Sequence, residues 1–546
     1  MIKLNNVRFA YRVNGKGFTV TTAESVQNSR ISLEIKENTE TLGISLKTKS
    51  EIEIVKLAAE FKYEYAESDR IFLNGYQSWT DSFEHDIHGR VRGIDHIPDL
   101  VNDKYAFEAY GDYTFTKYSR RRGVMHGWSY GYVKHSDGMF DFIGSLNEDD
   151  GFTKIKTDTN KGIVTVEKDC SGLYVTGGYE GISLYIGSGT EKEVFDGYFA
   201  WLGIAPKRPE RISGYTSWYR HYQDINERCI TNDLEGMESS DLDAKIFQID
   251  DGYQTAVGDW LSIDMAKFPN GMKPAADMIK EHGLTPGLWL APFVCEERSD
   301  MFRDHPEWML RNEAGEPVRA GSNWSGSYAL DIYNEAFRGY LREVFRTVTE
   351  EWGFGLLKLD FLYAACILPR RGKTRGMIMA DGMELLRECV GTAKILGCGV
   401  PLASAFGKVE YCRIGTDVTP EWDSRAYMQI LHRERPSTKY SMLSSVFRRQ
   451  LNGRAFINDP DVFMLRDTDT TMTSEQRLSL AEVNMLCGGV LFTSDDMGKY
   501  GDEQRELFDG MMSLRGAVVT AAEFTGSELI LSLDIDGRSV IRIYKM

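Results

Sequence analysis

Leu356-Leu357-Lys358-Leu359-Asp360 is a short apolar run that ends in a carboxylate, and Cys412-Arg413-Ile414-Gly415-Thr416-Asp417 ends in the same way. Both runs belong to a longer pattern, between about residues 205 and 515, in which candidate strands alternate with candidate helices. The candidate strands end at Trp218, Asp250, Phe293, Asp360, Ala403, Asp417, Asp461 and Asp495. Eight such units are typical of a (β/α)8 TIM barrel, whose parallel strands all end at one face. We therefore expect Asp360 and Asp417 to share a rim.

Helical sequence patterns occupy the intervals between these strands. They cover residues 226–237, 274–282, 336–352, 377–390, 439–451, 474–486 and 504–514, whereas the interval at 406–410 shows the weakest pattern. Pro274 is suited to the first position of its helix, because that position needs no amide hydrogen, and Gly283 is suited to a left-handed cap. Residues 205–515 are therefore predicted to form a barrel domain.

The regions on either side of the barrel have β-type sequence. From residue 1 to 195, short alternating runs at 18–22, 32–35, 41–46, 52–57, 162–167 and 172–176 predict an N-terminal antiparallel β-sandwich domain. From 516 to 546, runs at 529–533 and 539–544, joined by a turn at Asp536-Gly537, predict a small C-terminal antiparallel β-domain. The chain is thus expected to be a multidomain protein of β and α/β class.

The charge of the chain limits the kind of partner. With 81 acidic and 64 basic residues, the 546-residue chain has a formal net charge of -17. This disfavours contact with nucleic acid or anionic lipid, because both need a basic patch. No apolar run is long enough to span a bilayer or to serve as a secretory signal. We expect a soluble, cytoplasmic protein with a small-molecule partner, no nucleic acid and no membrane; a homo-oligomer is compatible with the sequence.

The cysteine pattern agrees with that location. The eight cysteines form no CxxC pair, so free thiols and no structural zinc are expected. The Asn323-Trp324-Ser325 sequon matters only in a secreted protein, and under the cytoplasmic interpretation it is a coincidence.

Carboxylates and indoles gather where the candidate barrel strands end. Asp250 and Asp251 close the second strand, and two adjacent like charges repel each other unless a ligand or hydrogen-bond donors organise them. Lys358 lies two residues before Asp360 and faces the same way, so it needs an anion beside it. Carboxylates hold sugar hydroxyls by charge-assisted hydrogen bonds, and an indole such as that of Trp289 offers a flat surface to a pyranose.

The two carboxylates at one rim can attack and protonate a single sugar acetal, which is the chemistry of a glycoside hydrolase. For any one Asp the alternative is a helix N-cap, because βα loops commonly place Asp before the next helix. The aspartates at the ends of the seventh and eighth strands are expected only to support other residues or to cap helices. They are Asp459, Asp461, Asp495 and Asp496.

The motifs together resemble those of α-galactosidases of glycoside hydrolase family 36, and their order and spacing are similar too. The stretches that carry the resemblance are Asp250-Asp251 with Gly258-Asp259-Trp260, residues 289–293, 358–362 and 397–402, and Arg413-Ile414-Gly415-Thr416-Asp417. The resemblance implies an N-terminal β-supersandwich, a central TIM barrel, a C-terminal β-domain and no cofactor or metal. It also implies that Asp360 is the nucleophile and Asp417 the general acid/base of a retaining reaction. In that reaction Asp360 stays ionised, helped by Lys358, and Asp417 holds a proton.

The resemblance further implies which residues bind the sugar. Asp250 and Asp251 would bind the 4- and 6-hydroxyls, and Lys358 and Arg413 would reach hydroxyls near C3 and C2. Cys398 and the Gly399 backbone would lie near the 2-hydroxyl, although a small buried residue remains the alternative for Cys398. The remaining candidates are aromatic, namely Trp218, Trp260, Trp289 and, from the N-terminal Leu73-Asn74-Gly75-Tyr76-Gln77-Ser78-Trp79 motif, Trp79 or Tyr76. Core packing is the alternative for Trp218, Trp79 and Tyr76.

The sequence therefore predicts a retaining, exo-acting α-galactosidase that acts on small oligosaccharides such as melibiose or raffinose. An α-N-acetylgalactosaminidase or a transglycosylase on the same fold is the alternative, and the space around Cys398 distinguishes the first of these. A catalytically silent sugar-binding protein is a third hypothesis. The presence of both Asp360 and Asp417 argues against it, because binding alone needs no matched acid and nucleophile.

Overall fold

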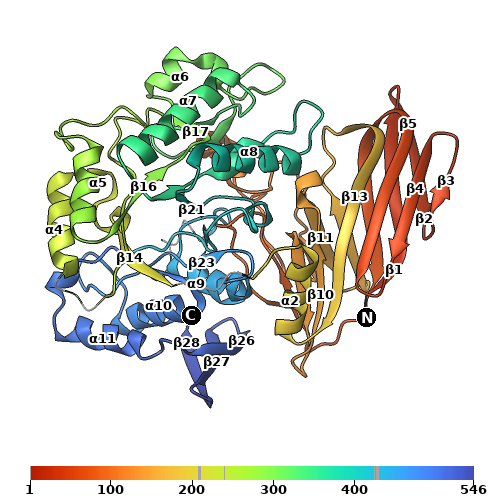
Figure 1. Cartoon of the computed structure of the whole chain (residues 1–546). Helices are drawn as coiled ribbons and strands as arrows, with labels where there is room; N and C mark the ends of the chain where they lie inside the picture. Colours follow the sequence, from red (N-terminus) through yellow and green to blue (C-terminus); the bar gives the residue numbers. More distant parts are fainter. Residues whose placement is uncertain (1, 207–210, 239, 241, 424, 426–428) are drawn as a thin grey trace.

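A wide antiparallel sheet and an α/β barrel lie side by side, and a small C-terminal sheet lies beside the barrel (Figure 1). The structure is a computed structural model that describes residues 2–546 except 207–210, 239, 241, 424 and 426–428. The fold class predicted from the sequence is confirmed. No helix within the described residues is long and apolar enough to cross a membrane.

The N-terminal sheet has 13 strands, ordered β7-β6-β9-β10-β13-β5-β12-β11-β8, with β1 and β4 also paired to β5. The sequence predicted two separate strands at 41–46 and 52–57, but both are parts of one long strand, β5. The bounds are β1 Lys3–Val13, β2 Lys16–Thr22, β3 Val26–Gln27, β4 Ile31–Glu37, β5 Thr41–Lys62, β6 Arg70–Leu73, β7 His85–Asp86, β8 Val124–Trp128, β9 Tyr130–Lys134, β10 Phe140–Ser145, β11 Thr153–Asp158, β12 Ile163–Lys168 and β13 Tyr174–Gly189.

This sheet buries residues on both faces. Ile71 and Val133, which pair across β6 and β9, pack in an apolar cluster with Phe9 on β1. Their neighbours Phe72 and Tyr132 point the other way and join a second cluster that includes the barrel core. Side chains alternate between the faces of a strand, so β6 and β9 connect the sandwich core to the barrel.

The barrel strands are all parallel to their neighbours, in the order β23-β22-β21-β20-β16-β15-β14-β25-β24. Only Pro460 and Asp461 separate β23 from β24, and the Gly489 amide before β25 donates to the Asn458 carbonyl on β23. The two ends of the series are therefore one interrupted strand, which closes an eight-stranded barrel. The bounds are β14 Ile212–Thr216, β15 Ile246–Ile249, β16 Thr285–Leu290, β20 Leu356–Leu359, β21 Lys394–Gly397, β22 Tyr411–Arg413, β23 Ile457–Asp459, β24 Val462–Phe463 and β25 Val490–Thr493.

The helices follow the predicted pattern with local differences. Helix α5 begins two residues earlier than expected, which places Pro274 at its third position, and Gly283 after it has the expected positive φ of 74°. The fifth strand, predicted to end at Ala403, ends at Gly397, and a short 3-10 turn at Leu402–Ala405 replaces a helix there. The bounds are α1 Asp99–Tyr105, α2 Glu191–Trp201, α3 Trp218–His221, α4 Glu227–Glu238, α5 Met272–Glu281, α6 Asp300–Asp304, α7 Glu335–Arg346, α8 Arg375–Val390, α9 Thr438–Phe447, α10 Ser474–Cys487 and α11 Asp502–Met512.

Two smaller sheets complete the fold. The long loop after β16 carries a three-stranded sheet made of β17 (Val294–Glu296), β18 (Arg319–Gly321) and β19 (Ser327–Ala329). The C-terminal sheet also has three strands: β26 (Val518–Phe524), β27 (Glu528–Ile535) and β28 (Arg538–Lys545). The sequence predicted β27 and β28 and their turn, but it missed β26.

Candidate active site

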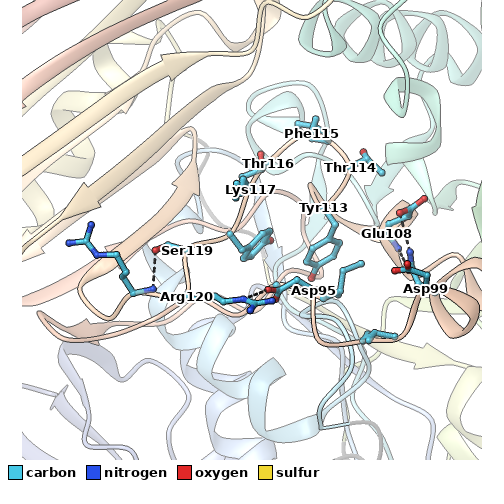
Figure 2. A pocket seen from close by; sticks show the side chains of 16 residues that line it. Asp95, Asp99, Glu108, Tyr113, Thr114, Phe115, Thr116, Lys117, Ser119 and Arg120 are labelled. Carbon is cyan, nitrogen blue, oxygen red and sulfur yellow. Dashed lines mark hydrogen bonds and ion pairs between the residues drawn. The ribbon is translucent and has the colours of Figure 1, made fainter.

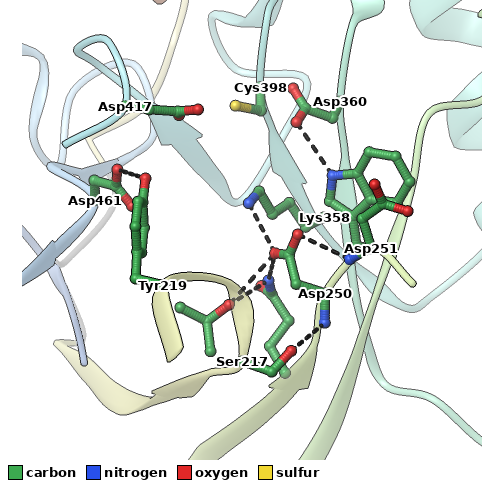
Figure 3. A network of polar contacts seen from close by, with 12 residues as sticks. Ser217, Tyr219, Asp250, Asp251, Lys358, Asp360, Cys398, Asp417 and Asp461 are labelled. Carbon is green, nitrogen blue, oxygen red and sulfur yellow. Dashed lines mark hydrogen bonds and ion pairs between the residues drawn. The ribbon is translucent and has the colours of Figure 1, made fainter. Parts of the chain in front are cut away.

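A cavity of about 220 Å³ opens where the barrel strands end, and both Asp360 and Asp417 line it. Figure 3 shows the two carboxyl groups on the same side of a polar network that contains Lys358 and Asp250. The predicted residues that line the cavity are Trp79, Trp218, Asp250, Asp251, Trp289, Lys358, Asp360 and Asp417. The barrel therefore brings together strand ends that lie up to two hundred residues apart in the sequence.

Lys358 and Asp250 form a buried ion pair at the floor of the cavity. The Lys358 Nζ lies 2.9 Å from the Asp250 Oδ2, which also accepts a hydrogen bond of 2.7 Å from the Gln248 side chain. Burial lowers the pKa of Lys358, but the Asp250 carboxylate, together with Asp360 and Cys398, raises it by more, so the pKa is raised overall. Lys358 is therefore a fixed cation, and Asp250 is the anion that it was expected to need.

Asp251 has its own set of donors. The indole Nε1 of Trp324 donates to its Oδ2 at 2.8 Å, and the side-chain amides of Gln223 and Gln254 donate at 2.9 and 2.6 Å. Burial raises the pKa of Asp251, although these donors lower it. The next helix, α5, begins only at Met272, so the N-cap alternative does not apply to this pair of aspartates.

Asp360 follows directly after β20 and is held by its neighbours. The Trp289 indole donates to its Oδ2 at 3.1 Å, and the amide of Phe361, which has a positive φ of 55°, donates to its Oδ1 at 2.9 Å. Burial raises the pKa of Asp360; the Lys358 cation lowers it, and the Asp417 charge raises it again. The sequence foresaw the influence of Lys358 but not that burial would exceed it.

Asp417 is the more exposed of the two acids, with 38% of its side chain accessible, and it pairs with Arg413 at 2.6 Å. The Arg413 guanidinium also contacts Asp459 at 3.2 Å and Asp461 at 2.8 Å. These two carboxylates have the supporting role predicted for them. Arg413 itself is buried behind the acid and is not part of the cavity wall, in contrast to the predicted contact with a sugar hydroxyl.

Trp79 reaches the cavity from the N-terminal region. Its indole Nε1 donates to the Cys398 Sγ at 3.2 Å, and its ring meets Phe361 edge to face with centroids 5.0 Å apart. Gly399 has a positive φ of 57°, and a Cβ there would lie 3.0 Å from both the Phe361 amide nitrogen and the Trp79 ring. Cys398 and Gly399 thus lie behind Trp79 and are not among the cavity-lining residues.

Two of the remaining aromatic candidates are not at the cavity surface. Trp260 is fully buried, and its ring packs edge to face against Trp289 with centroids 5.7 Å apart. Tyr76 is buried beside Trp128 and Cys366, so for it the core-packing alternative holds. Trp260 therefore supports the wall from behind, which corrects the prediction that it contacts substrate, because Trp289 covers it.

Comparisons with known proteins agree with this geometry. A family model described as Melibiase matches residues 207–365. Alpha-galactosidase AgaA of Geobacillus stearothermophilus is 30% identical over 158 residues, and Alpha-galactosidase 1 of Pediococcus pentosaceus is 25% identical over 178 residues. These matches cover 28% and 30% of this chain, but only 21% and 23% of the relatives.

The structural likeness extends along nearly the whole chain. The α-galactosidase TtGalA of Thermus thermophilus, solved with p-nitrophenyl α-D-galactopyranoside, has a TM-score of 0.73 at 25% identity, with 98% of both chains covered. The family 36 structure of AgaA has a TM-score of 0.62 at 14% identity, with 98% of this chain and 81% of AgaA covered. By these matches the chain is similar to α-galactosidases of glycoside hydrolase family 36.

Part of the cavity wall was not predicted from the sequence. Ser322, Asn323 and Trp324 come from the turn between β18 and β19. In the sequence, Asn323 and Trp324 stood out only as part of a glycosylation sequon, which was interpreted as a coincidence and not as part of a binding site. A further group comes from the N-terminal region and from the loop after β22, where no local pattern marked it: Phe107, Tyr110, Leu431, His432, Glu434 and Pro436.

A wider cavity of about 1060 Å³ lies away from the strand ends and is formed by residues 93–121 (Figure 2). Its charged residues include both signs, and Asp95 there is paired with Arg120 at 2.7 Å. Asp360 and Asp417 are not among its lining residues. The smaller cavity is therefore the candidate active site. Among the described residues, no group of three His, Cys, Asp or Glu side chains is arranged to hold a metal ion.

Proposed function

We propose that this chain is a retaining, exo-acting α-galactosidase, with Asp360 as nucleophile and Asp417 as general acid/base. The observation that carries the proposal is the shared cavity, in which both acids face a floor of hydrogen-bonded carboxylates, a lysine and indoles. The named α-galactosidases among the relatives support the same activity. The retaining mechanism expects the two carboxyl groups about 5 to 5.5 Å apart, against roughly 6.5 to 9.5 Å for an inverting enzyme.

In the proposed reaction, the Asp360 carboxylate attacks the anomeric carbon while Asp417 gives its proton to the departing oxygen. Water then attacks the galactosyl ester as Asp417 takes a proton from it, and Asp360 leaves. The Arg413 guanidinium, 2.6 Å from Asp417, would form a charge-assisted contact with the carboxylate that remains once the proton has been given up.

The space in the cavity beside C2 of the sugar decides between galactose and N-acetylgalactosamine, because only the latter carries an acetamide at C2. One relative, a blood-group A galactosaminidase of Flavonifractor plautii, is 32% identical over 128 residues. In this chain the fully buried Cys398 thiol and the Trp79 indole are in contact at 3.2 Å. That contact supports a closed wall where an acetamide would need space, and therefore favours galactose. Comparing aryl α-galactoside with aryl α-N-acetylgalactosaminide tests this choice.

Asp360→Ala and Asp417→Ala, assayed on an aryl α-galactoside, test the two roles. Each variant is expected to lose about 10³-fold or more in kcat, because each removes one half of the double displacement. Azide should restore product of opposite configuration in the two cases. It gives β-galactosyl azide with Asp360→Ala, where it replaces the nucleophile, and α-galactosyl azide with Asp417→Ala, where it replaces water. Unchanged turnover in either variant would contradict the assignment.

The cytoplasmic location remains part of the proposal. All eight cysteines have free thiols, and six of them are buried, which agrees with a reducing compartment. The test is to titrate the thiols of the denatured, unreduced protein purified from its native host. Eight thiols per chain are expected, and a lower count would contradict the proposed location.

A further inference from the structure

One wall of the cavity is built from the loop that also carries Asp417. Leu431, His432 and Glu434 line the cavity, and the amide of Ser437 at the end of this segment donates to the Asp417 carbonyl at 2.8 Å. In a glycosidase the group that protonates the departing oxygen lies on the side of the leaving group. If Asp417 has the role proposed above, on which this inference rests, the wall therefore faces the leaving group.

His432 is fixed between two aromatic rings from the N-terminal region. Its imidazole stacks on Tyr110 with centroids 5.0 Å apart and planes 6° apart, and Phe107 lies on it with centroids 5.2 Å apart. The His432 Nδ1 is 3.5 Å from the Glu434 Oε2, but this buried nitrogen makes no hydrogen bond with the described residues. Across the described parts of the chain, the Nε2 of His432 has no hydrogen-bond partner of its own. One polar edge of a rigid, stacked ring therefore remains available.

Glu434 holds this arrangement in place. Its carboxylate is buried and accepts hydrogen bonds from the Thr80 hydroxyl at 2.7 Å and the Tyr113 hydroxyl at 2.8 Å. Both donors come from the N-terminal region, so these two hydrogen bonds join the loop beside Asp417 to that region. A buried carboxylate with these donors costs less free energy than an unpaired one, so Glu434 holds the loop that carries His432 against the N-terminal region.

We infer that His432, together with Phe107 and Tyr110, forms the subsite for a sugar leaving group, a hexopyranose that departs from the galactosyl residue. The stacked rings supply apolar surface for its C–H groups, and the free Nε2 exchanges a hydrogen bond with one of its hydroxyls. Asn323, whose side chain accepts a hydrogen bond from the Tyr110 hydroxyl, extends the polar edge. This subsite selects sugar over aryl leaving groups.

The test compares two leaving groups on the same galactosyl residue: glucose in melibiose and p-nitrophenol in the aryl galactoside. His432→Phe keeps a flat ring between Phe107 and Tyr110 but removes both nitrogens. It is expected to lower kcat/KM for melibiose about tenfold, as for the loss of one hydrogen bond. The ratio of melibiose to aryl kcat/KM is expected to fall at least about fivefold, while inhibition by galactose, which fills only the galactosyl side, shifts less than about twofold.

A matched control is His88→Phe, because His88 is an exposed histidine in the turn after β7, paired with Glu67. This control should change neither the ratio of melibiose to aryl kcat/KM nor either rate. His432→Gln keeps a hydrogen-bonding group and should recover part of the melibiose activity, and it also serves if the Phe variant does not fold. An equal loss on both substrates, or no loss on melibiose, would overturn the inference. A wild-type protein that hydrolyses neither substrate would overturn the proposed function itself.

Discussion

The single most informative residue is Asp360, because its environment combines opposing effects. Burial raises its pKa, the Lys358 cation lowers it, and the Asp417 charge raises it, with a raised pKa overall. Lys358 is held 2.9 Å from Asp250, not from Asp360, so its effect on the nucleophile acts through space. The Trp289 and Phe361 donors orient the carboxylate for attack. A nucleophile must be ionised, so these effects set the acid side of the pH profile.

The first prediction is therefore a pH profile. Activity should rise as Asp360 loses its proton, so the acid limb of kcat/KM is expected above the ordinary Asp pKa of about 3.9. Lys358→Met removes a cation that lowers the Asp360 pKa, so its acid limb should move to still higher pH, along with a large loss of rate. Lys408→Met, which removes a surface lysine paired with Asp149, should leave the limb in place. A limb that moves down in Lys358→Met would contradict this account.

At the scale of elements, the strand ends could be predicted and the loops could not. Apolar runs that close on Asp placed β15 and β20 correctly, because that pattern is local, whereas the strand predicted to end at Asp417 is β22, which ends at Arg413. Asn323 and Trp324 lie on a turn within a long insertion after β16. No hydrophobic periodicity in the sequence predicts that this turn lies at the mouth of the barrel. The same holds for the fifth unit, where the strand ends at Gly397 and a short 3-10 turn follows.

The turn after β21 gives a prediction at this scale. Gly399→Ala introduces a Cβ that would lie 3.0 Å from the Trp79 ring, at a φ of 57°. The positive φ should cost about 1 to 2 kcal/mol of unfolding free energy, and the displaced indole should lower kcat/KM for the aryl galactoside about tenfold or more. Gly391→Ala is the matched control, because its φ is 65° and nothing lies within 4 Å of the new Cβ. It should show the stability loss alone; equal activity in the two variants would refute the role of Gly399.

At the scale of the molecule, the site belongs to neither half alone. Trp79, Phe107 and Tyr110 enter the barrel mouth from the N-terminal region, and the isolated bridge between Gln77 and Pro401 connects the two. The family resemblance suggested only that an aromatic residue of this region overhangs the site. Which aromatic it is depends on contacts between segments more than three hundred residues apart, and no local pattern encodes such contacts. This explains why Trp79 and Tyr76 could not be told apart from the sequence.

Arg448, at the end of α9, joins the two halves directly. Its fully buried guanidinium donates to the Asn74 side chain at 2.9 Å and to the backbone carbonyls of Ser78 at 2.8 Å and Ile414 at 2.9 Å. Burial lowers its pKa to about 10, so it stays charged near neutral pH. The Ser78 carbonyl immediately precedes Trp79, and Ile414 lies on the segment that leads to Asp417. One side chain thus fixes the overhanging indole relative to the acid.

Arg448→Met is therefore expected to affect stability and catalysis together. It leaves three or more buried acceptors without a donor, which should lower the unfolding free energy by about 3 kcal/mol or more, measured by urea denaturation. The activity of the folded fraction should fall as well, because Trp79 loses its anchor. Arg454→Met is the matched control: Arg454 also bridges to the N-terminal region, through Asp196 at 2.7 Å, but away from the cavity. It should cost at most about 1 kcal/mol and leave kcat/KM unchanged, whereas full activity in Arg448→Met would show that the indole is positioned by the barrel alone.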